Sequence, residues 1–227
     1  MTIRLDGVRV RLGDVDVLTD VSLGLDARTV AVIGENGSGK STFARLIGGM
    51  VARASGSVGI LGLDPRTQAA DLRRRIAMVF SNPDAQIVMP TVAEDVAFSL
   101  RGDRLSHAER TERVSAALAR FGLVELSERS SHDLSGGQKQ LLALCGAFVR
   151  EPELVIADEP TAYLDARNAR LVADHLFRDA GHRLVLVTHD LALAERCDVA
   201  VLFSQGRVAG VGEPDRVIAE YETILGC

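Results

Sequence analysis

A glycine-rich loop between an apolar run and a predicted helix constrains the fold of this chain more than any other feature. The run Val30–Ile33 is short and mostly β-branched, so it predicts a buried strand. A helix is expected over residues 41–50. Between the strand and this helix, and into its first residues, the chain reads Gly34-Glu35-Asn36-Gly37-Ser38-Gly39-Lys40-Ser41-Thr42. A strand, such a loop and a helix in this order predict a phosphate-binding loop in an α/β fold.

The chemistry of phosphate binding explains why these residue types are needed. Glycines let the backbone turn tightly and point successive N–H groups at phosphate oxygens. The helix that follows directs its positive N-terminal end to the same place. Lys40 is expected to reach the β- and γ-phosphates of a nucleoside triphosphate, and the Ser41 hydroxyl to bind Mg²⁺. The alternative is an ordinary glycine turn with an exposed lysine, and the flanking strand and helix argue against it.

Two acidic residues follow a second apolar run. Leu154–Ala157 predicts another buried strand, so Asp158 is expected at a strand end. An ionised aspartate there can hold Mg²⁺, usually through water. Glu159 comes next and is expected to polarise an attacking water as general base. A strand that simply ends in a solvated acidic turn is the alternative, which the phosphate loop upstream disfavours.

A third motif, Leu134-Ser135-Gly136-Gly137-Gln138, lies between the other two. Ser135 and Gln138 have the spacing of a capping box, which predicts a helix from Gly136 to about Val149. A helix that begins with Ser-Gly-Gly is also a good anion site. Together the three ordered motifs resemble those of the ATP-binding subunit of an ATP-binding cassette (ABC) transporter, and the resemblance covers nearly the whole chain.

This resemblance implies ATP and Mg²⁺ as ligands and a second ATPase chain as partner. In the family, the signature motif contacts the γ-phosphate held by the other chain, so two chains enclose two ATP molecules. A homodimer is favoured, and it would have C2 symmetry. The residues of this chain that would act on the partner's nucleotide are Ser135, Gly136, Gly137 and Gln138.

Two further family positions match residues of this chain. His189 follows the predicted strand Leu184–Val187 and resembles the switch histidine that senses the γ-phosphate near Glu159. A lone histidine is more often structural, but its place after a core strand favours the catalytic interpretation. Asp165, in Tyr163-Leu164-Asp165, resembles the residue that helps to join the two sites across the dimer.

Two positions depart from the family pattern. Ser81 stands where the family usually has a glutamine that links Mg²⁺ and the attacking water to the membrane partner. A serine hydroxyl is shorter and would need a bridging water, so Ser81 is only a weak metal-site candidate; Gln86 is close but out of register. Leu12 stands where an aromatic side chain usually stacks on adenine, so use of GTP stays open.

The chain of 227 residues is 47% hydrophobic, which suffices for one large core or two coupled lobes. A net charge of -5 gives no indication of a nucleic-acid surface. No apolar run approaches the length of about 20 residues that a membrane-spanning helix needs. Three widely spaced cysteines have no metal-site spacing and are interpreted as reduced thiols of a cytoplasmic protein: Cys145, Cys197 and Cys227.

The order of predicted elements indicates a single ABC ATPase domain over residues 1–227. Residues 2–25 predict an antiparallel strand pair, and strands alternate with helices from Leu154 onward, which implies a mainly parallel sheet. Residues of approximately 82–150 are mostly helical in pattern, with capping-box spacing at Thr91 and Ser106. The predicted fold is therefore an α/β P-loop NTPase of the ABC-ATPase type, with an N-terminal antiparallel β lobe and an inserted helical subdomain.

One stretch is similar to the ATPases of energy-coupling factor (ECF) importers. It reads Phe80-Ser81-Asn82-Pro83-Asp84-Ala85-Gln86-Ile87, followed by Pro90-Thr91-Val92-Ala93-Glu94-Asp95-Val96-Ala97-Phe98. Within that group the chain looks most like the biotin-transport ATPases, with cobalt or nickel import second. The ATPase of another ABC transporter is the nearest rival. A soluble ABC ATPase is less favoured, since coiled-coil insertions or a second cassette do not fit this length. A small-molecule kinase would lack the signature motif.

The ECF resemblance implies a transmembrane coupling subunit, a solute-binding membrane subunit and a peripheral position on the cytoplasmic face of the membrane. The coupling subunit is expected to dock around residues 82–91. There Ile87, Val88 and Met89 would form an exposed apolar patch. The alternative is that these three residues belong to the buried core.

Overall fold

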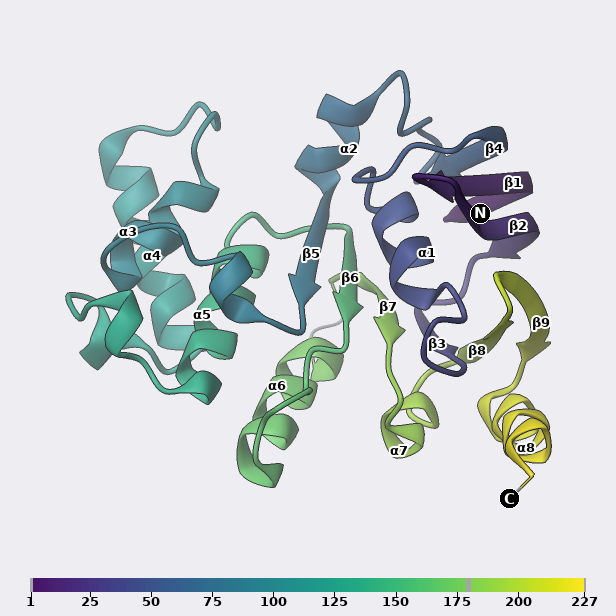
Figure 1. Cartoon of the computed structure of the whole chain (residues 1–227). Helices are drawn as coiled ribbons and strands as arrows, with labels where there is room; N and C mark the ends of the chain where they lie inside the picture. The colour runs from purple at the N-terminus through teal and green to yellow at the C-terminus, as the bar shows by residue number, and fades with distance from the viewer. Residues whose placement is uncertain (1, 179–180, 227) are drawn as a thin grey trace. The chain divides into compact units, whose positions relative to one another are not determined.

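A computed structural model describes residues 2–178 and 181–226 of the chain. The chain forms two compact units, which Figure 1 shows together. The first unit comprises the chain up to Ile76, Ile156–Glu159 and the chain from Arg183 onward; the second comprises Ala77–Val155 and Pro160–His182. The second unit therefore extends beyond the predicted helical lobe on both sides.

The first unit contains a three-stranded sheet in the order β2-β1-β4. Its strands are β1 (Ile3–Leu12), β2 (Val15–Leu25) and β4 (Ser55–Ile60), and β1 pairs antiparallel with both neighbours. Apolar residues alternate along the sheet, and the buried ones give it one core-facing side. The antiparallel strand pair predicted over residues 2–25 is confirmed, and the chain turns between its strands at Gly13 and Asp14.

A second sheet of the first unit carries the phosphate loop. β3 (Thr29–Ile33) lies between β7 (Arg183–Val187) and β8 (Val199–Ser204) and is parallel to both, while β9 (Arg207–Gly212) is antiparallel to β8. β6 (Leu154–Asp158) is the neighbour of β7, and Figure 1 shows the two running in the same direction. Parallel strands bring their carboxyl ends to one edge, so the segments after β3, β6 and β7 meet there.

The first unit contains four of the described helices, and α8 is the longest of them. They are α1 (Lys40–Ile47), α2 (Ala69–Arg75), α7 (Leu191–Ala194) and α8 (Pro214–Leu225). The face of α1 that includes Phe43 is fully buried, and the Phe43 ring lies 5.1 Å from that of Phe203. This packing fixes the helix, and with it the end of the phosphate loop, against β8.

The second unit is mainly helical, as predicted. It contains α3 (Val92–Ser99), α4 (His107–Arg120), α5 (Gly136–Phe148) and α6 (Ala166–Arg178), together with most of β5 (Ile76–Phe80) and the first residues of β6. Capping boxes start α3 at Thr91, α4 at Ser106 and α5 at Ser135. All three were expected from the spacing of Ser or Thr and Glu or Gln alone. A 3₁₀ turn, Pro83–Ala85, lies between β5 and α3, and two more, Val124–Leu126 and Ser131–Asp133, lie between α4 and α5.

The described cysteines are buried thiols. Burial raises the pKa of Cys145 and of Cys197 to about 12, which makes both poor nucleophiles at neutral pH. Cys227 lies outside the described residues. Within residues 2–178 and 181–226, no helix is long and apolar enough to cross a membrane.

Candidate functional site

Two glycines of the phosphate loop have conformations and surroundings that no other residue would tolerate. Gly34 has φ 141°, and a Cβ at this position would lie 2.1 Å from the carbonyl oxygen of Phe203. Gly39 has φ 105°, and its Cβ would lie 2.7 Å from Leu18 Cδ2. The loop therefore turns where neighbouring chain leaves no room for a side chain. Its backbone can approach a ligand closely for the same reason.

Lys40 is buried and is held by the loop itself. Its Nζ donates to the carbonyl oxygens of Gly34 at 2.6 Å and Glu35 at 2.8 Å. Burial lowers the pKa of Lys40, and the nearby carboxylates of Glu159 and Asp158 oppose that shift. An ammonium group has three N–H donors, so one donor remains for a ligand in the loop.

A small hollow of about 210 Å³ opens at the loop. The hydroxyl of Ser38 is buried in this loop without a hydrogen-bond partner among the described residues. An unpaired buried hydroxyl in this loop is a group that a ligand oxygen would satisfy. The hollow is lined by Val17, Asn36, Gly37, Gly39, Lys40, Ser41, Thr42 and Glu159.

Val17 is a lining residue that no sequence pattern indicated. Its aliphatic side chain comes from β2 and borders the hollow beside the phosphate loop. Leu12, which sequence alignment places at the usual aromatic position, is 42% exposed at the end of β1. The hairpin between β1 and β2 thus brings an aliphatic surface to the loop through Val17.

Ser41 and Asp158 come together as predicted. The Ser41 hydroxyl donates to Asp158 Oδ1 at 2.9 Å. Burial raises the pKa of Asp158, while the Ser41 hydrogen bond and the positive charges of Arg45 and Lys40 oppose that rise. Two hard oxygen donors at this distance form one side of a site that fits Mg²⁺.

Glu159 and His189 also meet, at the ends of β6 and β7. His189 Nδ1 and Glu159 Oε2 are 2.7 Å apart, and the Glu159 N–H donates to the carbonyl oxygen of Val187 at 2.9 Å. Glu159 has φ 51°, a left-handed conformation that is costly for a non-glycine residue. Strain at this position indicates that the surrounding chain holds the carboxylate in one place.

The signature motif lies in the second unit, at the start of α5. The Ser135 hydroxyl accepts from the Gln138 N–H at 3.3 Å, and the Gln138 Oε1 accepts from the Ser135 N–H at 2.9 Å. The N–H groups of Gly136 and Gly137 belong to the first turn of α5, which has no intrahelical acceptor for them. This helix start therefore offers backbone donors to an anion.

Steric contact explains why the second residue of the glycine pair in the signature, Gly137, has no side chain. A Cβ on Gly137 would lie 2.4 Å from Cγ of Asn168. The Asn168 amide in turn donates to Asp165 Oδ2 at 2.8 Å, and its backbone N–H donates to Asp165 Oδ1 at 2.8 Å. Asp165 thus fixes a side chain that packs directly on the signature motif. Tyr163, two residues before it, has φ 64° and is 97% exposed.

Ser81 is half-buried and follows β5 in the second unit. The nearby Gln86 does not take over as a free polar group, because its amide is bound at both ends. Its Oε1 accepts from the Phe80 N–H at 2.8 Å, and its Nε2 donates to the Met78 carbonyl oxygen at 2.9 Å. Gln86 therefore fastens its own segment to β5.

None of the three residues of the predicted patch is buried, but only Val88 is largely exposed. Val88 is 60% exposed, and Ile87 and Met89 are both half-buried. The buried carboxylate of Asp95 accepts from the N–H groups of Val88 and Met89 at 2.8 and 2.9 Å. The exposed apolar side chain thus stands on a segment that hydrogen bonds hold in place.

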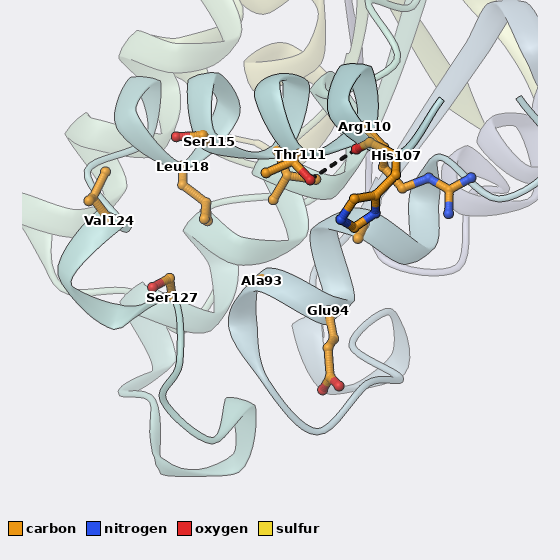
Figure 2. Close-up of a pocket in the computed structure, with 11 residues that line it drawn as sticks. Ala93, Glu94, His107, Arg110, Thr111, Ser115, Leu118, Val124 and Ser127 are labelled. Atoms are coloured by element: carbon orange, nitrogen blue, oxygen red, sulfur yellow. Dashed lines mark hydrogen bonds between the residues drawn. The ribbon is translucent and has the colours of Figure 1, made fainter. Parts of the chain in front are cut away.

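A larger hollow of about 410 Å³ lies elsewhere in the second unit (Figure 2). His107 and Arg110 of α4 lie at one end of it, and Leu118 and Val124 at the other. None of the site residues predicted from the sequence lines this hollow. The smaller hollow at the phosphate loop is the one that gathers the predicted chemistry.

Comparison with known proteins identifies relatives over almost the whole chain. A family model described as ABC transporter matches residues 18–162. The energy-coupling factor transporter ATP-binding protein EcfA1 of Symbiobacterium thermophilum is 42% identical over 96% of this chain and 76% of its own length. The biotin transport ATP-binding protein BioM of Rhizobium etli is 37% identical over 99% of both chains.

Two solved structures are similar as well. CbiO1 from Clostridium perfringens, described as part of the ABC transporter complex cbiONQ, superposes with a TM-score of 0.85 at 30% identity and covers 99% of this chain and 93% of its own. An ATP-binding cassette in a dimeric post-hydrolysis state with ADP and inorganic phosphate has a TM-score of 0.81 at 27% identity, over 94% and 99% of the two chains.

Proposed function

The chain belongs to the ABC transporter family as an ATP-binding subunit that hydrolyses ATP, and from this premise we propose that it powers an importer of the ECF type. The similarity to EcfA1, BioM and CbiO1 supports the ECF assignment. The observation that carries the mechanism is the meeting of Lys40, Ser41, Asp158, Glu159 and His189 at one edge of the sheet of the first unit. Residues 1–227 act as one ABC ATPase domain.

The phosphate loop binds the triphosphate of ATP. Backbone N–H groups of residues 34–42 surround the phosphates, and the buried ammonium of Lys40 bonds to their β and γ oxygens. The orphaned Ser38 hydroxyl supplies a further donor. The adenine rests on aliphatic surface around Val17 rather than on an aromatic ring, so the base contributes less to affinity than the phosphates.

Mg²⁺ fits between the Ser41 hydroxyl and the Asp158 carboxylate. Among the described residues no group of three or more His, Cys, Asp or Glu side chains converges on a metal position. The remaining ligands would be phosphate oxygens and water, as Mg²⁺ prefers. The ion would neutralise charge on the β- and γ-phosphates. Ser81 is the weakest candidate for this site, since its hydroxyl would need a bridging water.

Glu159 acts as the base that orients and polarises the attacking water. His189, at hydrogen-bond distance from Glu159, holds the carboxylate in position and stabilises the γ-phosphate region. The left-handed backbone at Glu159 supports this role, because strain of this kind persists where the surroundings fix a functional group.

Two copies of the chain complete each other's sites. The capped start of α5, with Ser135, Gly136, Gly137 and Gln138, supplies N–H donors to the γ-phosphate on the phosphate loop of the partner. The dimeric relative with ADP and inorganic phosphate supports this arrangement. ATP closes the homodimer with C2 symmetry, and hydrolysis with product release reopens it.

A transmembrane coupling subunit docks on the exposed patch of Ile87, Val88 and Met89 at the cytoplasmic face of the membrane. A small solute-binding membrane subunit joins it. The exposed Val88 on a segment fixed by Asp95 supports this surface, because a rigid apolar patch suits a partner's helix. No nucleic acid takes part. Opening and closing of the ATPase dimer moves the coupling subunit and drives import.

The exchange Val88→Asp tests the docking surface. We expect loss of the membrane subunits from the purified complex, with nucleotide affinity of the isolated chain within twofold of the wild type. Val88 is largely exposed, so the unfolding free energy should change by less than about 1 kcal/mol. Retention of the membrane subunits, or a global loss of stability, would argue against docking here.

Biotin is the favoured solute, with cobalt or nickel uptake as the alternative. The similarity to BioM over 99% of both chains supports biotin. The decisive experiment isolates the tagged chain from native membranes, identifies its partners by mass spectrometry and measures uptake of labelled biotin and Co²⁺ by the reconstituted complex. An ECF-type importer predicts one coupling subunit and one small solute-binding protein. A conventional permease pair or an exporter would refute the ECF assignment and leave the ATPase standing.

A further inference from the structure

The two residues that follow the signature motif both hold the segment after β5. Lys139 Nζ lies 2.8 Å from Asp84 Oδ1, and the buried Gln140 donates through Nε2 to the Phe80 carbonyl oxygen at 3.1 Å. Lys139 and Gln140 are on the first turns of α5, directly after Gln138. The signature helix is therefore tied to the segment of residues 80–89 by two side chains of its own.

The signature helix also packs on the 3₁₀ turn Pro83–Ala85 of this segment, so the two polar contacts add to packing between the two elements. A hollow of about 420 Å³ lies between them, bordered by Ser81–Asp84, the start of α5 and Ala162–Leu164. Side chains that face a hollow share few apolar contacts across it. The Lys139–Asp84 pair and the Gln140–Phe80 hydrogen bond join the two elements at the edge of this hollow.

The segment itself is stiff enough to transmit a displacement. Gln86 binds the Phe80 N–H and the Met78 carbonyl oxygen, which fastens one end to β5. The Asn82 side chain accepts from the Asp84 N–H at 3.0 Å, which fixes the backbone next to the ion pair. Asp95 holds the other end through Val88 and Met89.

We propose that the Lys139–Asp84 pair couples the segment of residues 80–89 to the signature helix, with Lys139 as a positioning residue for the signature motif. The inference rests on the proposed function, because the force on this segment comes from a membrane partner docked at Val88. Lys139 touches neither nucleotide nor attacking water in this account. It acts by setting where the donors of Gly136 and Gly137 lie.

A second ion pair in the same unit provides a matched control. Arg150 Nη2 lies 3.0 Å from Asp103 Oδ1, just beyond the other end of α5. Asp103 lies between α3 and α4, so Asp103→Asn removes an ion pair of the same unit and leaves residues 80–89 untouched. Asp103→Asn is therefore the control for Asp84→Asn.

The first test uses the membrane complex purified through the tagged full chain, and the isolated chain beside it. For the complex carrying Asp84→Asn or Lys139→Met, we expect kcat to fall about fivefold with KM for ATP unchanged, as a partly exposed ion pair permits. The isolated chain should change less than about twofold. The charge exchange Asp84→Lys with Lys139→Asp should restore at least half of the lost rate, and Asp103→Asn should behave as wild type.

Loss of rate to the same extent in the complex and in the isolated chain would overturn the proposal, as would a failure of the charge exchange to restore the rate.

A second measurement does not need the membrane partner. Hydrogen exchange of the isolated full chain should speed up at the amides of residues 138–142 in Asp84→Asn and not in Asp103→Asn. Unchanged exchange there refutes the coupling. If the tagged wild-type chain is purified from membranes without any membrane subunit, the proposed function is refuted instead. The hydrogen-exchange measurement then still tests whether the Lys139–Asp84 pair holds the signature helix.

Discussion

The phosphate-loop region of the first unit and the signature region of the second differ in how their polar groups are satisfied. In the first, charged side chains hold one another or the loop: Lys40 binds two carbonyl oxygens, Asp158 binds Ser41, and Glu159 meets His189. The signature region has no ionisable side chain within its motif. It offers a capped helix start with free backbone donors.

Because of this difference, the two regions are suited to different roles. The first region gathers charged groups that burial and strain hold in place, and in the proposed function these groups bind phosphate and move a proton. The second can only present hydrogen-bond donors to an anion, and in the proposed function that anion is a nucleotide carried by another copy. The comparison predicts that changes in the first region abolish chemistry outright, whereas changes in the second remove only the contribution made to a partner.

The largest effect is expected for Lys40→Met. It removes the buried ammonium that fastens the loop and that we propose bonds to the β- and γ-phosphates. ATP turnover should fall at least about 1,000-fold and nucleotide affinity at least about tenfold, since a charge-assisted contact is lost. Steady-state ATPase assays with nucleotide titration check both values. Turnover within tenfold of wild type would show that the first region is not the centre of the chemistry.

Glu159→Gln should separate binding from hydrolysis. The amide keeps the shape of the side chain but accepts no proton, so turnover should fall about 100- to 1,000-fold while ATP affinity stays within about threefold. Single-turnover assays and nucleotide titration measure the two quantities. Undiminished turnover would remove Glu159 as the base and leave His189 as the remaining candidate.

Ser135→Arg tests the role of the signature region. A bulky cation at the start of α5 blocks the anion site of the signature and removes the cap of the helix. Turnover should fall about 100-fold, as for loss of a set of transition-state donors. Nucleotide affinity of the isolated chain should not change. A loss of affinity equal to that of Lys40→Met would mean that the signature acts within its own chain.

A small effect is expected for the ion pair of Arg53 and Asp64 in the first unit, which belongs to neither of the two regions. Arg53 contacts Asp64 through two hydrogen bonds of 2.8 Å and lowers the pKa of Asp64 to about 2. The folded pKa lies below the unfolded one of 3.8, so the stabilisation is present above about pH 4 and disappears as the pH falls towards 2.

Asp64→Asn should therefore lower the unfolding free energy by about 1 kcal/mol at pH 7, allowing for solvent screening of this partly exposed pair. The difference from wild type should shrink between pH 4 and pH 2, as denaturant titrations at several pH values would show. Turnover at pH 7 should be unchanged, because the pair lies outside both regions. If the difference in unfolding free energy between wild type and Asp64→Asn grew as the pH fell, the predicted pH dependence would be contradicted.

Local sequence signals predicted most of both regions. Spacing alone located the three capping boxes, and the two apolar runs located the strands that deliver the phosphate loop and Asp158. These signals succeed because a cap or a buried strand depends on residues close in the chain. The features that escaped prediction depend on distant residues: the Phe203 carbonyl that excludes a side chain at Gly34, Val17 beside the loop, and Asn168 against Gly137.

The exposure of the apolar residues 87–89 could not be predicted from the sequence. Ile87, Val88 and Met89 fit exposure and burial equally well by composition. In the structure Val88 is exposed and Ile87 and Met89 are half-buried, while the Asp95 carboxylate holds the backbone of Val88 and Met89. The sequence also left Gln86 unassigned, and its two hydrogen bonds to β5 give it a structural role.

The most direct test of the account mixes two inactive variants, Lys40→Met and Ser135→Arg. In a mixed dimer, the intact phosphate loop of the second variant faces the intact signature of the first, so one complete site forms. The account predicts that mixing restores ATP hydrolysis to at most about a quarter of the wild-type rate, since half of the dimers are mixed and each has one site. A rate no higher than the sum of the separate variants would contradict the claim that the two regions complete each other across a pair of chains.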